Sequence, residues 1–141
     1  MDTARVVNGK ERRHGGALRV LIAYDERDTV DTLAVVLESE GHIVQRAYGG
    51  AEVLPAVPVF RPDVIILDIS VPVISGFGIA QAIRHSFTDI RRPLLIAISG
   101  KWMQGPDRLI ARQVGFDHYL VKPCDPGVVL ELLARSDRPA A

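Results

Sequence analysis

Residues 64–68 read Val-Ile-Ile-Leu-Asp, an unbroken apolar run that ends on one acidic residue. Continuous rather than alternating apolar residues are typical of a strand that is covered by helices on both faces. Two similar runs lie before and after it in the chain, at Val20–Ala23 and Leu94–Ile98. The three runs therefore predict the central strands of a parallel sheet.

Two more short segments complete the predicted sheet, at Ile43–Ala47 and Tyr119–Val121. Stretches of helical length follow the five strands in turn: Asp28–Glu40, Ala51–Val57, Gly76–Ser86, Pro106–Val114 and Asp125–Ala134. Strict alternation of strand and helix predicts an α/β fold, a doubly wound parallel sheet of five strands with helices on both faces.

Capping residues and prolines refine the prediction for three of these helices. Asp28 or Thr29 is expected to cap the first helix, and Asp125 is expected to cap the last. Pro55 and Pro58 each remove a backbone donor, so the helix over residues 51–57 is expected to be short or distorted.

Length and composition limit the classes of protein to which the chain can belong. The 141 residues suit one domain, and 48% apolar with 24% charged residues is ordinary for a folded chain. We expect a mobile tail over residues 1–17, the domain over 18–134 and a short tail over 135–141, with no room for a second domain. Seventeen basic residues balance seventeen acidic ones, so no net positive field favours direct contact with nucleic acid.

Cysteine usage and hydropathy suggest a compartment. Cys124 is the only cysteine, so the chain cannot form an internal disulfide, which fits a reducing, cytoplasmic location. The sequence holds no apolar run long enough to span a bilayer, so no membrane contact is expected.

Four polar residues follow four of the predicted strands: Asp25, Asp68, Ser99 and Lys122. Ligands of such sheets bind outside the carboxyl ends of the strands, where these side chains are expected to meet. Carboxylates, a hydroxyl and an ammonium suit a hard cation together with a phosphoryl group, and Mg²⁺ is the expected ion. Asp68 would act as a nucleophile toward phosphorus, for which its carboxylate must be open to solvent.

Several short motifs then identify a family. They are Arg-Pro-Asp-Val-Ile-Ile-Leu-Asp at 61–68, Pro72 with Gly76, Ile-Ser-Gly at 98–100, and Gly-Phe-Asp-His-Tyr-Leu-Val-Lys-Pro at 115–123. With these motifs, residues from about Leu18 to Ala134 resemble the receiver domain of two-component response regulators, a CheY-like domain.

The resemblance implies a flavodoxin-like fold with strand order 2-1-3-4-5, and it implies roles for individual residues. Asp68 would be the phosphoacceptor, Asp25 a metal ligand together with Asp68 and the backbone carbonyl of Ser70, Ser99 the switch hydroxyl, Tyr119 the switch aromatic and Lys122 the phosphate-pairing lysine. The family usually joins lysine and proline by a cis peptide, which Pro123 permits.

The same resemblance implies partners. A sensor histidine kinase or a histidine phosphotransfer protein would supply the phosphoryl group. A downstream protein would read the surface formed by Pro106–Val114, the fifth strand and Asp125–Ala134, and a homodimer could use the same face. The domain would be no enzyme beyond its own phosphotransfer and dephosphorylation.

One position departs from the family pattern. Receiver domains commonly carry two adjacent acids after the first strand, whereas Tyr24 precedes Asp25 here. The neutral phenol removes a negative charge from the metal's surroundings, so Mg²⁺ should bind more weakly unless Glu26 turns inward. The alternative function is a degenerate receiver-like interaction module that is not phosphorylated.

Two enzyme or cofactor classes share parts of this pattern. Phosphatases with an aspartate nucleophile typically place a second acid two residues later, where this chain has Ser70. A flavodoxin-type FMN protein needs a phosphate loop after the first strand, where Asp25, Glu26 and Asp28 would repel the ligand. The four histidines show no ligand spacing and are expected at the surface.

Overall fold

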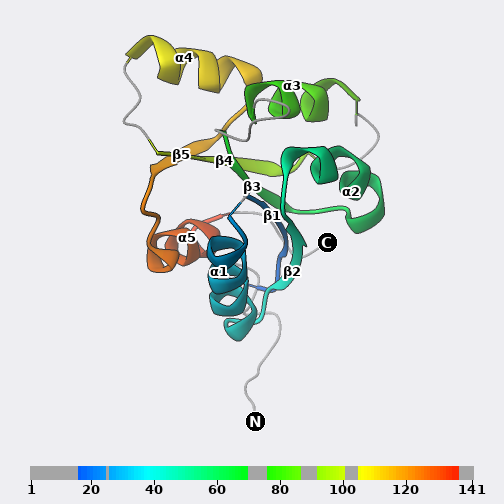
Figure 1. The fold of residues 1–141 in the computed structure, drawn as a ribbon, viewed down its shortest axis with the longest axis vertical. Helices are drawn as coiled ribbons and strands as arrows, with labels where there is room; N and C mark the ends of the chain where they lie inside the picture. The colour runs from blue at the N-terminus through cyan, green and yellow to red at the C-terminus, as the bar shows by residue number, and fades with distance from the viewer. Residues whose placement is uncertain (1–15, 25, 70–75, 87–91, 101–104, 137–141) are drawn as a thin grey trace.

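A five-stranded parallel sheet forms the centre of the described part of the chain, with the strand order β2-β1-β3-β4-β5 (Figure 1). The structure is a computed structural model and describes residues 16–24, 26–69, 76–86, 92–100 and 105–136. The strands are β1 (Arg19–Ala23), β2 (Ile43–Ala47), β3 (Val64–Asp68), β4 (Leu94–Ser99) and β5 (His118–Val121). The predicted fold class and strand order are confirmed.

Helices cover both faces of the sheet. They are α1 (Arg27–Ser39), α2 (Val53–Phe60), α3 (Gly76–Ser86), α4 (Gly105–Val114) and α5 (Pro126–Ala134), and a 3-10 turn over Gly50–Glu52 precedes α2. Helices α1 and α5 lie together on one face, and α2, α3 and α4 lie on the other (Figure 1). Because all the strand pairs are parallel, the carboxyl ends of the strands lie together along one edge of the sheet.

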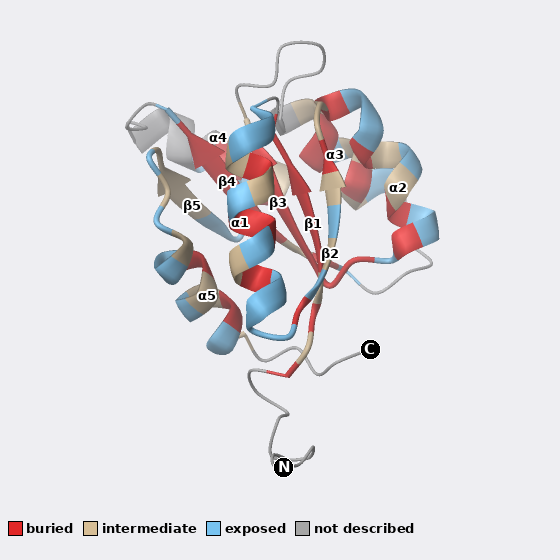
Figure 2. Cartoon of the chain, turned by 60° about the horizontal axis from the view of Figure 1, so that its bottom comes forward, coloured by how far each residue is buried: buried red, intermediate tan, exposed pale blue. Residues whose placement is uncertain are grey.

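The core consists of two apolar layers, one on each face of the sheet. Strand β3 contributes to both, because Ile65 and Leu67 face α2, α3 and α4 while Val64 and Ile66 face α1 and α5. Every residue of β3 is buried, and β1 and β4 are buried along nearly their whole length (Figure 2). The continuous apolar runs therefore mark the central strands, as predicted.

The helix caps agree only in part with the prediction. The expected cap of α1 by Asp28 or Thr29 is wrong: the N-cap residue is Glu26, whose side chain makes no capping bond to the helix backbone. The Thr29 hydroxyl instead donates to Glu26 Oε1 at 3.2 Å. The cap of α5 is as predicted, because Asp125 Oδ1 accepts the Gly127 N–H at 2.9 Å.

Helix α2 is longer than the prolines suggested. It runs as an α-helix to Phe60, three residues past the predicted end. Pro55 lies in the first turn, where an N–H needs no helical partner, and only Pro58 lies inside the helix. The apolar residues Val53, Val57 and Phe60 are buried against the sheet, and this packing offsets the lost hydrogen bond.

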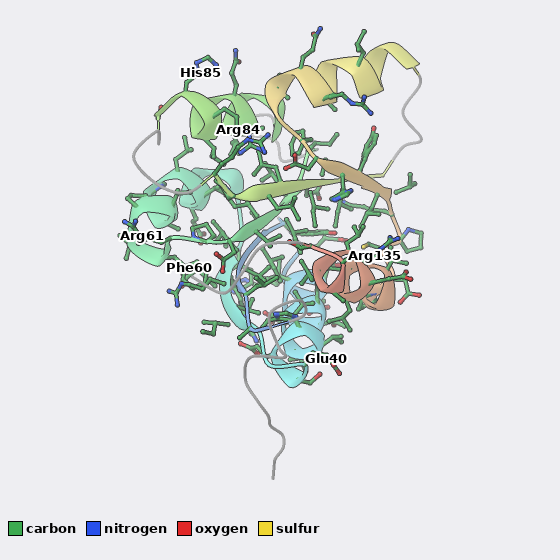
Figure 3. The ribbon with its side chains drawn as sticks, turned by 180° about the vertical axis from the view of Figure 1, so that it is seen from behind. Glu40, Phe60, Arg61, Arg84, His85 and Arg135 are labelled. Carbon is green, nitrogen blue, oxygen red and sulfur yellow. The ribbon has the colours of Figure 1, made fainter. Side chains whose placement is uncertain are left out.

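A hydrogen-bond network closes the amino-terminal edge of β4 and β5. Arg84 reaches from α3 toward the sheet (Figure 3) and donates from Nη1 to Pro93 O at 3.0 Å and from Nη2 to Gly115 O. Asp117 Oδ2 accepts the Leu95 N–H at 2.9 Å and lies 3.3 Å from Arg84 Nη2. The network ties α3 to the turn between α4 and β5.

His42 corrects the expectation that the histidines lie at the surface. Its side chain is buried, and Nδ1 accepts the Leu18 N–H at 3.1 Å. His85 and His118 are exposed, and His14 lies outside the described residues. His42 thus supports the start of β1 through a contact that ligand spacing could not reveal.

Most of both predicted tails falls outside the described residues, so the tails stay predictions. Among the helices of the described ranges, none combines the length and the apolar character that crossing a membrane would take.

Candidate functional site

Three of the predicted site residues meet at the carboxyl edge of the sheet. Asp68 is the last residue of β3, Ser99 the last of β4, and Lys122 directly follows β5. Lys122 Nζ lies 2.7 Å from Asp68 Oδ2, although 54 positions separate the two residues in sequence. The Lys122 N–H also donates to Ser99 O at 2.7 Å, which anchors the lysine beside β4.

The Asp68 carboxylate is closed to solvent. Its side chain is 0% exposed, whereas that of Lys122 is 27% exposed. The expectation of an open carboxylate is therefore wrong for this arrangement, because the ammonium lies directly against it. A buried carboxylate needs such a partner, since burial of an unpaired charge costs several kcal/mol or more.

Ser99 and Tyr119 lie near this pair on neighbouring strands. Ser99 is buried at the end of β4, next to Val121 in the strand register. Tyr119 is half-buried in β5 and packs against the apolar layer formed with α2, α3 and α4. The geometry places both side chains on the elements that the resemblance implies, and their switch roles stay predictions.

The remaining metal-ligand predictions divide into two groups. Asp25 and Ser70 lie outside the described residues, so their roles stay predictions. Glu26 is exposed, and its carboxylate accepts the Thr29 hydroxyl instead of turning toward Asp68.

The donor set of the site fits magnesium. Asp68 offers a hard oxygen ligand at the strand edge, and Mg²⁺ commonly takes one or two protein carboxylates and keeps several waters. The described ranges hold no group of three or more acidic, histidine or cysteine side chains that could cage a metal. Asp68 thus supplies one of the hard oxygen ligands that a hydrated Mg²⁺ would need.

Tyr24 directly follows β1 and is 1% exposed. Burial, and then the nearby Cys124, Asp68 and Glu26, raise the pKa of its phenol far above the usual value, so the phenol stays neutral. Its ring centroid lies 5.3 Å from Lys122 Nζ. The sequence identified Tyr24 as a departure from the family pattern, but it gave no sign of this contact with the lysine.

A cavity of about 490 Å³ lies beside the pair, between the start of α1 and the loop that leads into α5. Tyr24, Lys122 and Cys124 are among the residues that line it. Lys122 thus borders open space on the side of α1 and of the loop into α5.

Cys124 should react slowly with alkylating agents. Burial, and then the nearby Asp125, raise the pKa of its thiol, which leaves less of the reactive thiolate at neutral pH. We expect iodoacetamide at pH 7.5 to modify the folded chain several-fold more slowly than the urea-unfolded chain, measured by mass spectrometry. The rate on the folded chain should rise with pH as the thiolate forms. Equal rates for the folded and unfolded chains would contradict this.

Comparison with known proteins matches most of the chain to one protein family. The family model described as "Response regulator receiver domain" matches residues 20–134. The transcriptional regulatory protein PrrA of Mycobacterium tuberculosis is 38% identical over 117 residues, which are 83% of this chain and 47% of PrrA. The chain thus spans about half the length of the curated relatives it matches.

Solved structures agree with the fold. The chemotaxis response regulator CheY4 of Vibrio cholerae is 28% identical with a TM-score of 0.74, and the match covers 84% of this chain and 98% of CheY4. The receiver domain of the sensor histidine kinase PA1611 from Pseudomonas aeruginosa is 26% identical with a TM-score of 0.74, with 86% of this chain and 98% of that domain covered. That structure has a magnesium ion coordinated in its active-site cleft.

Proposed function

This chain belongs to the response regulator receiver domain family, and from that premise we propose that Asp68 accepts a phosphoryl group from a phosphohistidine. The donor would be a sensor histidine kinase or a histidine phosphotransfer protein. The observation that carries the proposal is the contact of 2.7 Å between Asp68 Oδ2 and Lys122 Nζ at the carboxyl edge of the sheet. An acid held on a buried strand beside a partly exposed ammonium suits phosphoryl transfer.

The proposed reaction exchanges one bond to phosphorus for another. A carboxylate oxygen of Asp68 forms the new O–P bond while the N–P bond of the phosphohistidine breaks. The electron pair of that bond stays on the imidazole nitrogen, which takes up a proton. Lys122 then moves from the carboxylate to a phosphoryl oxygen, and the Ser99 hydroxyl donates to another.

Magnesium is the proposed cofactor. Asp68 would hold it together with Asp25 and the carbonyl of Ser70, and the bound ion would neutralise part of the charge on the transferred group. The magnesium ion in the PA1611 receiver domain supports this proposal.

The proposed output is a change at the surface of α4, β5 and α5. The acyl phosphate at Asp68 would carry up to about two negative charges in place of the one on the carboxylate, and its phosphoryl oxygens would draw Ser99 toward them and let Tyr119 turn inward. A downstream protein, or a second copy of the chain, would read the changed surface. PrrA is a transcriptional regulatory protein, so the expected absence of nucleic-acid contact is not confirmed.

We propose no enzyme activity toward other substrates, and a cytoplasmic location. The chain would turn over no substrate other than its own phosphoryl group, which it would accept and later lose to water. A kinase that carries its phosphohistidine in the cytoplasm would place this chain in the cytoplasm as well.

The test is magnesium-dependent labelling by a small phosphodonor such as acetyl phosphate. We expect the wild-type chain to gain one phosphoryl group in MgCl₂ and much less in EDTA, and Asp68→Asn to gain none, because the amide is no nucleophile. Glu38→Gln is the control, since Glu38 is exposed on α1 and does not line the cavity beside the site, and it should be labelled like the wild type. Equal labelling of Asp68→Asn, or a folded wild-type chain that no donor labels, would overturn the assignment.

A further inference from the structure

The Lys122 ammonium lies between two groups that attract it. Its Nζ is 2.7 Å from Asp68 Oδ2 and 5.3 Å from the centroid of the Tyr24 ring. The first distance is that of a charge-assisted hydrogen bond, and the second lies within the range of a cation–π contact. A neutral aromatic residue therefore contacts the charged pair on which the proposed function depends.

The Tyr24 ring has little freedom to move. It belongs to the apolar layer under α1 and α5 and is 1% exposed. Its backbone N–H donates to Ala47 O at 3.3 Å, which ties it to the end of β2. Lys122, in contrast, keeps part of its side chain in solvent. The ring is thus the fixed partner, and the lysine is the movable one.

The ring, not the hydroxyl, makes the contact. Among the residues that the structure describes, the buried Tyr24 hydroxyl has no hydrogen-bond partner. A carboxylate at position 24 would compete with Asp68 for the ammonium, because both groups are anionic. The aromatic face attracts the ammonium more weakly, so it steadies Lys122 without drawing it from Asp68.

We propose that Tyr24 is a positioning residue for phosphoryl transfer, whose ring holds the Lys122 ammonium on Asp68 and makes this closed pair the resting state of the site. The proposal rests on the proposed function of Asp68 as the acceptor. It also accounts for the closed carboxylate, because Lys122 covers Asp68 and the ring steadies Lys122 in that place. A divalent cation that binds Asp68 must then compete with a lysine that the ring retains.

The first measurement is Mg²⁺ binding by isothermal titration calorimetry on the full chain, without any phosphodonor. Tyr24→Leu removes the ring at similar volume, and we expect it to bind Mg²⁺ about 2- to 5-fold more tightly, the effect of losing one partly exposed cation–π contact. Tyr24→Phe keeps the ring, so its Mg²⁺ affinity should lie within about twofold of that of the wild type. Tyr24→Met serves as a second ring-free variant if the leucine variant does not fold.

A Lys122→Met background separates positioning from packing. Without the ammonium, Tyr24→Leu and Tyr24→Phe should bind Mg²⁺ with equal affinity, because only the lysine transmits the effect of the ring. If Tyr24 had a merely structural role, the difference in Mg²⁺ affinity between Tyr24→Leu and Tyr24→Phe would be the same with Lys122 and with Met at position 122.

The second measurement is the NMR shift of the Lys122 ε-methylene protons, which reports the ring face directly. Wild type and Tyr24→Phe should show an upfield ring-current shift that Tyr24→Leu lacks. The proposal is overturned if that shift is absent from the wild type, or if the Mg²⁺ difference persists in the Lys122→Met background. Since neither measurement uses a phosphodonor, the two failures are distinguishable. Failure of Asp68 labelling would overturn the proposed function and with it the role of Tyr24 in phosphoryl transfer, whereas failure of these two measurements would overturn only the role of Tyr24.

Discussion

Lys122→Met is expected to lower the free energy of unfolding by about 3 kcal/mol, the low end of the cost of breaking a buried ion pair. The Asp68 carboxylate is 0% exposed, and the Lys122 ammonium at 2.7 Å offsets the loss of its hydration. Methionine fills similar space but carries no charge, so the carboxylate would remain buried without its cation. The low end applies because Lys122 is itself 27% exposed. Urea unfolding at neutral pH measures the loss.

The double variant Asp68→Asn/Lys122→Met distinguishes a charge effect from a packing effect. Removal of both charges should restore most of the stability, because a neutral amide costs far less to bury than an unpaired carboxylate. Asp68→Asn alone should cost little, since Lys122 can extend into the neighbouring cavity and into water. A double variant as unstable as Lys122→Met would contradict the electrostatic account.

Gly115→Ala is expected to cost about 2–4 kcal/mol, from backbone strain together with a steric clash. Gly115 has φ +113°, a conformation that residues with a Cβ rarely adopt. A Cβ at this position would lie 2.5 Å from Arg84 Nε and 2.7 Å from Arg84 Cγ. Arg84 would have to leave Pro93 O and Gly115 O, so the network between α3, α4 and β5 would break. Thermal or urea unfolding of the variant checks the value.

Gly49→Ala is the matched control for this prediction. Gly49 has φ 179°, which is extended backbone, and a Cβ there would meet nothing within 4 Å. We expect this substitution to change stability by less than about 0.5 kcal/mol. If the two variants lost similar amounts of stability, the backbone conformation and the close Arg84 side chain at Gly115 would not be the cause of the loss.

The sheet could be predicted from the sequence because its central strands are buried on both faces. Burial on both sides demands continuous apolar residues, and the runs that contain Ile22, Ile66 and Ile96 meet that demand. Helix ends were harder to predict. Pro58 argued for an early end of α2, yet tertiary packing of Phe60 carried the helix past it.

The convergence of three polar residues at one edge of the sheet could be predicted, but the pairing of two of them could not. The strand-end rule brought Asp68, Ser99 and Lys122 to one edge, where the structure places them. Whether a lysine covers its carboxylate depends on the path of its side chain and on neighbours such as Tyr24. His42 shows the same limit, because its buried imidazole accepts a hydrogen bond from the Leu18 N–H, 24 positions away, which no local motif could reveal.

Identification of the phosphorylated residue tests the central claim most directly. An aspartyl phosphate is an acyl phosphate, and borohydride reduces it to the alcohol, which converts the labelled aspartate into homoserine. After treatment with acetyl phosphate and Mg²⁺, tandem mass spectrometry should find homoserine at position 68. Homoserine at another aspartate, or at no position in a chain shown to be folded, would contradict the account.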